Sequence, residues 1–459
     1  MDRSAGPGGL GRAFVGITAT LALATGAFSA YGFVSYLNAG DEGTIDWVLP
    51  TSEGAGAPAP AVGPCVEDVC NYLLLGSDSR AGLTPEEQAQ FGSDEFIGGE
   101  NRADTIMLVQ LDPTREKAVV LSFPRDLWVR IPGRGWDRIN SSFEGGVRGG
   151  GPRRVAETVH ELTGLTINHF LYVDLLGFQK VVDTLGGVEM CVPYAVQDPL
   201  AALDLEAGCQ RLDGRQALAY VRTRHFPCDG SAPDLHRIGR QQQFFRAVIN
   251  QLLRPDRIVR APSLVGPVLR NLDRDRELRV ADLVYLVGRL RGVSTGAVEF
   301  RTVPAVPDTV RPSGFTSDIS ILRVDPSAER IFQALRRGSR LPSAGTELVN
   351  TPPSPATIEV AVMDTGSPTV TREVEDVVAT SGFDTSPGVV SAAAAGVSRR
   401  GAPILYAPGR LDEAKVVAQF FPGADLREFE GATGWDVAVV AAEDLAVGPT
   451  EEAPAEPDC

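Results

Sequence analysis

The stretch NRADTIMLVQLDPTREKAVVLSFPRD, residues 101–126, decides the fold prediction because it holds two short apolar runs with charged residues beside them. The runs are TIMLVQL (105–111) and AVVLSF (118–123). Both are rich in β-forming residues and have the length expected of strands. Asp112, in the LDPT segment between them, is typical of a turn or a cap. The stretch therefore predicts two strands of a sheet.

Similar runs and several helical patterns extend outward from this stretch. Further strands are predicted at NYLLL (71–75), HFLYV (169–173), GVEMCV (187–192) and ALAYV (217–221). Helical periodicity is present in PRRVAETVHELTG (152–164), LLGFQKVVDTLGG (175–187) and RIGRQQQFFRAVINQLL (237–253). Asp174, just before the second of these, is expected in a turn or cap. The alternation predicts an α/β or α+β sandwich with a mixed central sheet flanked by helices.

Arginines and aspartates recur at the ends of these elements. The polar motifs GSDSR, PRD and RTR follow NYLLL, AVVLSF and ALAYV, and ligand sites of layered sheets gather at such strand ends. Guanidinium forks suit phosphate oxygens. The candidate arginines are Arg80, Arg102, Arg125, Arg222, Arg224, Arg237 and Arg240, and the accompanying aspartates are Asp78, Asp104 and Asp126. Together they predict a phosphate-handling site with a divalent cation. The alternative is a buried structural network in which Asp and Arg neutralise one another.

The helix predicted at 237–253 has two kinds of face. Arg237 and Gln241 are four residues apart with Arg240 beside them, so the three side chains can lie on one side. Apolar residues at the remaining positions are expected to pack inward: Ile238, Phe245, Ile249 and Leu252. Asp234, just before this stretch, is either an N-cap or a functional carboxylate.

The charge of the chain is negative overall and positive in one region. The 459 residues carry a formal charge of -16, which disfavours a protein that coats nucleic acid. Residues 211–260 nevertheless contain ten arginines and four aspartates. This concentration favours an anion site, although a solvated basic helix face has the same composition.

An uncharged apolar segment lies near the N-terminus. Residues 13–37 contain no charged side chain over a length sufficient for a membrane span, which needs about 20 residues. Arg3 and Arg12 precede the segment and Asp41 and Glu42 follow it, so the N-terminus is expected in the cytoplasm and the rest outside. A cleaved secretory signal is the alternative, because Ala27 and Ala30 are small. The Pro, Gly and Ala residues of 51–64 predict an extended stalk.

The cysteines agree with export. Six are present, all beyond the apolar segment, and none has the CxxC spacing of a metal site. Local pairing of Cys65 with Cys70, and of Cys191 with Cys209, is plausible, while Cys228 and Cys459 are candidates for free thiols.

A change in composition after Arg340 predicts a second unit. The segment LPSAGTELVNTPPSPAT is rich in Pro, Ser and Thr, as linkers are. Strands are then expected at IEVAVMDT, PILYAPGR and DVAVVAAEDL, with helices around 374–381 and at LDEAKVVAQFF. The predicted division is an N-terminus (1–12), a transmembrane anchor (13–37), an extracellular linker (38–69), a main domain (70–340), a linker (341–355), a small α/β domain (356–446) and an acidic disordered tail (447–459).

From Asn71 to about Gln243 the chain resembles the LytR-CpsA-Psr family of cell-wall ligases. The segments that carry the resemblance are LLLGSDSR, RADTIMLVQLDP, SFPRDLWVRIPG, RINSSFEGG, TVHELTGLTINHFLYVD, FQKVVDTLGGVEM, LDGRQALAYVRTRH and DLHRIGRQQQF, in that order. Any one of them is weak support, whereas eight in sequence are strong. The C-terminal unit resembles the small LytR-type domain attached to actinobacterial members. One departure is the stretch of residues between Arg224 and Asp234, which is longer than the family pattern and leaves Asp229 as a competitor of Asp234.

The resemblance implies transfer of a glycopolymer from a polyprenyl pyrophosphate carrier to peptidoglycan, with a possible pyrophosphatase side activity. The expected phosphate clamps are Arg102, Arg125, Arg222 and Arg224, assisted in substrate binding by Arg80 and Arg240. Asp104, with Asp78 second, is expected to hold Mg²⁺ or Mn²⁺. The residues expected to orient the clamps or the acceptor are Asp126, Asp234, Arg237 and Gln241. The alternatives are a non-catalytic protein that binds anionic wall polymers and a transcriptional attenuator. The expected export disfavours the attenuator, as does the absence of a basic DNA-reading helix.

Overall fold

The computed structural model describes most of the chain between Ala61 and Val447. The described residues are 44–45, 61–65, 69–78, 84, 86, 102–112, 114–115, 117–146, 149–192, 195–224, 233–253, 266–279, 298–312, 316–339, 341–342, 355–397 and 404–447. The side chains of 44–45, 233–235 and 253 are not among them. Arg80, Asp229, Cys228, Cys459 and the apolar segment 13–37 lie outside this part of the chain.

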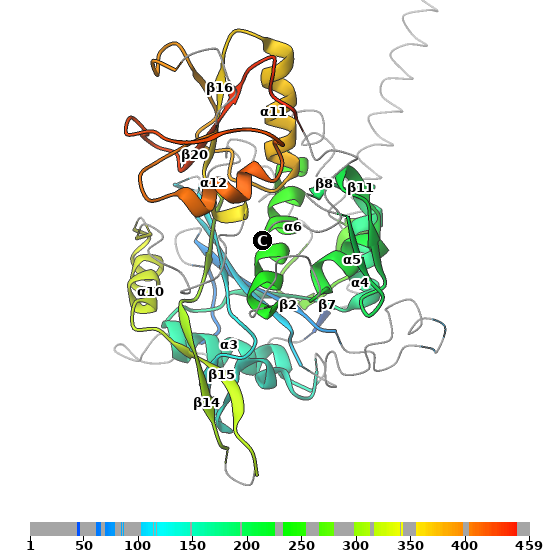
Figure 1. Cartoon of the computed structure of the whole chain (residues 1–459). Coiled ribbons are helices and arrows are strands. Elements are labelled where there is room, and N and C mark those ends of the chain that lie inside the picture. The colour runs from blue at the N-terminus through cyan, green and yellow to red at the C-terminus, as the bar shows by residue number, and fades with distance from the viewer. Residues whose placement is uncertain are drawn as a thin grey trace, which may run out of the picture.

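A mixed sheet forms the centre of the main domain (Figure 1). Its seven described strands run in the order β1 (Thr44–Ile45), β12 (Asp273–Asp275), β7 (His169–Val173), β2 (Cys70–Gly76), β3 (Thr105–Asp112), β4 (Lys117–Ser122) and β13 (Val298–Thr302). β3 is antiparallel to both neighbours, whereas β7 is parallel to β2 and β13 is parallel to β4. The predicted mixed sheet and its strands at 71–75, 105–111, 118–123 and 169–173 are confirmed.

Both faces of this sheet are buried, because apolar side chains alternate along its strands. Leu73, Leu75 and Ile106 pack on one face with residues of α3 (Gly151–Thr163) and α10 (Ala328–Arg337). Tyr72, Met107 and Val120 point to the opposite face, where Phe245 and Ile249 of α6 (Pro233–Leu253) cover them. The main domain is therefore a sandwich of one sheet between helices, as predicted.

Helices α4 (Leu175–Thr184), α5 (Gly214–Arg222) and part of α6 enclose a second apolar cluster with short strands. The strands are paired as β8 (Val188–Val192) with β11 (Gly208–Leu212) and β9 (Val196–Asp198) with β10 (Leu203–Leu205). Asp174 caps α4, since its Oδ1 accepts the Gly177 N–H at 2.7 Å. The helices predicted at 152–164, 175–187 and 237–253 are α3, α4 and α6.

The prediction of a strand at ALAYV (217–221) is wrong, because these residues form the second half of α5. Asp213 begins the helix with a capping box: its side chain accepts the Gln216 N–H at 2.8 Å, and the Gln216 side chain accepts the Asp213 N–H at 3.1 Å. Ala and Leu are strong helix formers. The apolar run was too short to separate a buried strand from a buried helix by periodicity alone.

Smaller elements lie at the periphery of the main domain. Two hairpins pair β5 (Trp128–Ile131) with β6 (Gly135–Arg138) and β14 (Ala305–Val310) with β15 (Ile319–Val324). A 3-10 helix, η1 (Ile139–Phe143), follows β6 and packs on α3.

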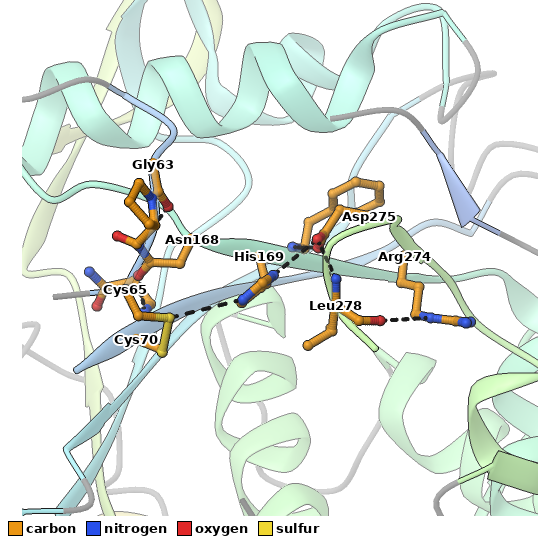
Figure 2. Close-up of polar contacts among 11 residues, drawn as sticks. Gly63, Cys65, Cys70, Asn168, His169, Arg274, Asp275 and Leu278 are labelled. Atoms are coloured by element: carbon orange, nitrogen blue, oxygen red, sulfur yellow. Dashed lines mark hydrogen bonds and ion pairs between the residues drawn. A yellow bond between two sulfur atoms is a disulfide. The ribbon is translucent and has the colours of Figure 1, made fainter. Parts of the chain in front are cut away.

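The chain that enters the main domain is fastened beside β2 and β7 (Figure 2). The Asn168 side chain donates to the carbonyl oxygens of Gly63 and Pro64 at 2.8 and 2.7 Å, and a disulfide joins Cys65 to Cys70 at the start of β2. His169 lies between the disulfide and the buried Asp275 carboxylate, with its Nε2 4.0 Å from Cys65 Sγ and its Nδ1 3.0 Å from Asp275 Oδ1. The second disulfide joins Cys191 to Cys209, so both predicted pairings are confirmed.

A separate five-stranded sheet forms the C-terminal domain, residues 355–447 (Figure 1). Its strand order is β17 (Val389–Ser391), β16 (Val360–Asp364), β20 (Val437–Ala441), β18 (Ile404–Tyr406) and β19 (Leu426–Glu428). The helical elements are η4 (Pro355–Thr357), α11 (Pro368–Thr380) and α12 (Leu411–Ala418). The β/α elements predicted after the linker are confirmed in order and type. α11 contacts α6 and β8 of the main domain.

Among the described residues, no helix combines the length and the apolar character needed to span a bilayer.

Candidate functional site

Two carboxylates meet at one edge of the central sheet. Gly76, the last residue of β2, pairs with Thr105, the first residue of β3, so Asp78 and Asp104 follow and precede neighbouring strand ends. The Asp104 N–H donates to the Gly76 carbonyl oxygen at 2.9 Å, which fixes the backbone there. Burial raises the pKa of Asp104, and the nearby Asp78 carboxylate raises it further, while Arg125 and Arg237 act to lower it.

Arg125 joins this pair from the turn after β4. Ser122, the last residue of β4, pairs with Met107 of β3, so the turn lies beside the start of β3. The Arg125 Nη1 donates to Asp104 Oδ1 at 2.8 Å. Asp126 supports the arginine from behind: its Oδ2 lies 3.5 Å from Arg125 Nε, and its Oδ1 lies 3.4 Å from Arg138 Nε. Asp126 therefore contacts the guanidinium groups of both Arg125 and Arg138.

Arg222 enters from the C-terminal end of α5. Its Nε lies 3.3 Å from Asp78 Oδ1, and its side chain is only 3% exposed. A cation is favoured at this end of a helix because the last carbonyl groups carry partial negative charge. Arg224 follows two residues later and is half-buried. The C-terminal end of α5 thus places Arg222 at Asp78, and Arg224 follows Arg222 directly after the helix.

α6 adds two buried arginines. Arg237 is 2% exposed and close enough to Asp104 to act on its pKa, and Arg240 is 6% exposed. The Arg240 Nη2 donates to the Thr223 carbonyl oxygen at 2.5 Å, and the Gln241 amide approaches the Val221 carbonyl oxygen at 3.5 Å. Arg240 and Gln241 thus reach the end of α5, and Arg237 lies near Asp104. Arg237 and Arg240 are buried, whereas Gln241 is partly exposed.

The remaining predicted residues are placed differently. Arg102 is exposed, two residues before Asp104, and does not take part in the ion pairs described around Asp104. Arg80 and the side chain of Asp234 lie outside the described residues. The structure thus brings together Asp78, Asp104, Arg125, Asp126, Arg222, Arg237, Arg240 and Gln241, which we call the arginine site.

The predicted structural alternative is partly present. Arg125 pairs with Asp104 and Arg222 with Asp78, as a neutralising network requires. Around this centre the described side chains bring Arg125, Arg222 and Arg237 together with Asp78, Asp104 and Asp126. Buried charges are costly unless they are paired, and several guanidinium groups from separate segments in one place are more typical of a functional site than of a structural network.

The carboxylates are compatible with a divalent cation. Asp104 Oδ2 is buried and has no hydrogen-bond partner among the described residues. Mg²⁺ in phosphate sites commonly takes one or two carboxylates and fills its shell with waters and phosphate oxygens. The described residues contain no cluster of three or more His, Cys, Asp or Glu suited to an all-protein metal cage. Asp78 and Asp104 therefore fit a cation shared with a phosphate.

Sequence reasoning missed several residues that support the site. Thr223 donates its hydroxyl to the buried Asp198 at 2.5 Å, and Arg138 holds Asp126. Tyr220 and Gln243 form a buried hydrogen bond beside the arginines. The capping box was the available signal for α5, and with it for Tyr220, whereas Asp198 lies in a short strand that no pattern marked.

The fold and the arginine site define a class of protein: an α/β sandwich in which arginines and aspartates meet at the ends of the central strands. Residues 52–328, more than half of the chain, match the LytR_cpsA_psr family, and the chain belongs to that family.

Several relatives are named for work on the cell wall. The probable cell wall biosynthesis protein LcpB of Corynebacterium glutamicum is 39% identical over 234 residues, covering 51% of this chain and 54% of that protein. A polyisoprenyl-teichoic acid–peptidoglycan teichoic acid transferase, TagU of Oceanobacillus iheyensis, is 33% identical over 214 residues, covering 46% and 60%. The chain thus spans less than two thirds of the length of these relatives.

Matches among solved structures include Bacillus subtilis TagV and a LytR-Csp2A-Psr enzyme from Actinomyces oris. TagV is 20% identical with a TM-score of 0.47, covering 60% of this chain and 96% of that one. The Actinomyces oris enzyme is 24% identical with a TM-score of 0.44, covering 64% and 94%.

Proposed function

We propose that this protein is a membrane-anchored, extracellular phosphotransferase that moves a glycopolymer from a polyprenyl pyrophosphate carrier to peptidoglycan. The observation that carries the proposal is the convergence of Arg125, Arg222 and Arg237 on Asp78 and Asp104 at one sheet edge. Family membership and the names of the relatives support the same reaction class.

The proposed reaction breaks a phosphoanhydride bond and forms a phosphate ester bond. A hydroxyl oxygen of peptidoglycan attacks the sugar-proximal phosphorus, the bond from that phosphorus to the bridging oxygen breaks, and polyprenyl phosphate leaves. The hydroxyl proton is released to water, and a phosphodiester joins the polymer to the wall. Such transfer depends mainly on positioning and on neutralising the charge of the pyrophosphate. Arg125, Arg222 and Arg237 neutralise that charge, while Asp126 holds Arg125 in place.

Asp104 and Asp78 would hold Mg²⁺ or Mn²⁺, which when bound neutralises phosphate charge as a Lewis acid. Arg125 contacts Asp104 and Arg222 contacts Asp78. The arginines that would bind the pyrophosphate therefore also orient the two carboxylates that would bind the cation.

The proposed location follows from residues 13–37. An uncharged segment of this length is sufficient to anchor the chain, with the short N-terminus in the cytoplasm and the main domain outside. Two disulfides in the main domain support an oxidising exterior. A position outside the membrane gives the arginine site access to lipid-linked polymer and to peptidoglycan.

The proposal is tested with the full chain in detergent, a polyprenyl-pyrophosphate-linked disaccharide, peptidoglycan fragments and Mg²⁺. Wild type should release polyprenyl phosphate and transfer the labelled sugar. Arg222→Lys should be slower by about tenfold or more, because lysine lacks the planar fork and charged hydrogen bonds are worth about 1.5–3 kcal/mol. Arg330→Lys, on the exposed surface of α10, is the matched control and should retain full activity.

The result also separates the ligase from a non-catalytic binder of anionic polymer. A wild-type protein that retains the lipid-linked sugar without ever releasing polyprenyl phosphate would establish the binder instead. Equal rates for wild type and Arg222→Lys would remove the arginine site from the mechanism.

A further inference from the structure

α6 connects the arginine-bearing segments of the main domain. Its side chains at positions 240 and 241 reach the end of α5 through the carbonyl oxygens of Thr223 and Val221. These two acceptors flank Arg222. A shift of α6 would therefore move the backbone that carries Arg222.

The next side chain of α6 reaches the strand that leads to Arg125. The Gln242 Nε2 donates to Ser122 Oγ at 3.0 Å and to Thr302 Oγ1 at 2.9 Å. Ser122 ends β4, three residues before Arg125, and Gln242 itself is 1% exposed. The helix is thus bonded both to α5 and to the end of the central sheet.

Gln243 extends this set of contacts to the C-terminal domain. Its Nε2 donates to the Ser381 carbonyl oxygen at 2.7 Å, and its Oε1 accepts the Tyr220 hydroxyl at 2.7 Å. All three residues are at most 4% exposed. Because a carbonyl oxygen can only accept, Ser381 fixes which end of the amide faces α5. The contact with the C-terminal domain therefore keeps the Gln243 Oε1 directed at Tyr220, where it accepts the hydrogen bond from the Tyr220 hydroxyl.

Two further contacts hold the same face of α6. Arg246 lies 3.3 Å from the Asp384 carboxylate, and the Asn250 side chain donates to the Ala379 carbonyl oxygen at 3.1 Å. Positions 243, 246 and 250 lie three and four residues apart, so they form one stripe of the helix. In Figure 1 the C-terminal end of α6 lies against the C-terminal domain, with α11 beside it.

We propose that the C-terminal domain positions the arginine site by clamping α6, with Gln243 as the link between Ser381 and the Tyr220–Arg222 end of α5. This inference rests on the proposed phosphotransfer and assigns the small domain a part in it. Gln243 and Tyr220 are positioning residues, since they act on Arg222 and do not themselves touch the phosphates.

Gly382 offers a way to disturb this contact from the C-terminal domain alone. A Cβ atom there would lie 2.6 Å from the Gln243 carbonyl oxygen and 2.7 Å from its Cγ, so Gly382→Ala must separate the two domains locally. Gly382 also has a φ of +76°, which strains any alanine. Gly388→Ala is the matched control, because Gly388 has a φ of +65° and nothing within 4 Å of the added Cβ.

The full chain is assayed for polyprenyl phosphate release from the lipid-linked disaccharide with Mg²⁺, as before. Gly382→Ala should lower kcat by about tenfold, with KM for the lipid-linked sugar unchanged, since misplaced groups near a reacting centre slow the chemical step. Gly388→Ala should match wild type. Tyr220→Phe should also lower kcat. In the double variant with Gly382→Ala, the fold-decrease in kcat should be smaller than the product of the two single fold-decreases, because both substitutions break the same link.

Amide hydrogen exchange of residues 217–223 is measured on the same five proteins, independently of activity. Faster exchange in Gly382→Ala than in Gly388→Ala supports the clamp even if wild type proves inactive, in which case only the proposed phosphotransfer fails. Equal kcat and equal exchange in the two glycine variants overturn the clamp. If Gly382→Ala does not fold, Tyr220→Phe decides: unchanged kcat and exchange overturn it.

Discussion

Asp104 is the residue at which the separate parts of the arginine site meet. Its carboxylate accepts a hydrogen bond from Arg125, and its pKa is raised by Asp78 and lowered by Arg237. Its second oxygen is buried and has no hydrogen-bond partner among the described residues. The residue types and their order along the chain were sufficient to predict that Asp104 and Arg125 belong to one site. Their burial was not predicted, because composition gives no information on the segments that cover a charged residue.

A pH effect is expected at Asp436 of the C-terminal domain. Burial raises the pKa of this carboxyl, against the opposing effects of the Glu359 N–H and of Arg410, whose Nε lies 3.2 Å away. The folded-state pKa is above the unfolded one, so the stabilisation from protonated Asp436 is complete below about pH 4 and is lost as pH rises through the raised value. The free energy of unfolding of Asp436→Asn should therefore fall less between pH 4 and 7 than that of wild type, as checked by denaturant titration. Parallel pH curves would contradict this.

At the scale of elements, α5 is the instructive case. The run ALAYV is apolar throughout and has the length of a strand, so its periodicity did not reveal a helix. The capping box of Asp213 and Gln216 did specify the helix, and local chemistry of that kind is visible in sequence. The long helix α6 was predicted correctly because its pattern extends over many turns. The contacts of α6 at positions 240–243 could not be predicted, because they join segments distant along the chain.

The cap of α5 should be measurable in stability. Asp213→Ala removes the acceptor of the Gln216 N–H and should lower the free energy of unfolding by about 1 kcal/mol. Because α5 carries Arg222 at its other end, polyprenyl phosphate release should also slow. Denaturant unfolding compares this variant with Glu206→Ala, an exposed carboxylate between β10 and β11 that should cost little. A stability of Asp213→Ala equal to that of the control would show that the cap does not hold α5.

At the scale of the whole molecule, the sequence indicated two folded units but not their contact. The α/β pattern after the linker was visible in alternating apolar runs, whereas Gln243, Arg246 and Asn250 had no pattern that marked them as an interface. Polar side chains on a buried helix face are ambiguous in sequence, since water, a ligand or another domain can satisfy them equally. Only the tertiary arrangement separates these possibilities.

The expected anchor is tested on cells that express the full chain. If residues 13–37 stay in the membrane, the protein should remain with membranes after a carbonate wash and retain its original N-terminal residues by mass spectrometry. External protease should reach the main domain and leave Met1 to Arg12 protected. Recovery of a soluble chain that begins just after Ala27 or Ala30 would instead establish a cleaved signal.

The fastening of the incoming chain has a mechanical consequence. Tension that reaches Ala61 along the backbone first loads the hydrogen bonds that Asn168 and Ile167 make to residues 61–64. If those bonds break, the disulfide from Cys65 to Cys70 transmits the tension directly to the first residue of β2. Only residues 61–64 can therefore detach before the force acts on β2, a strand in the interior of the sheet.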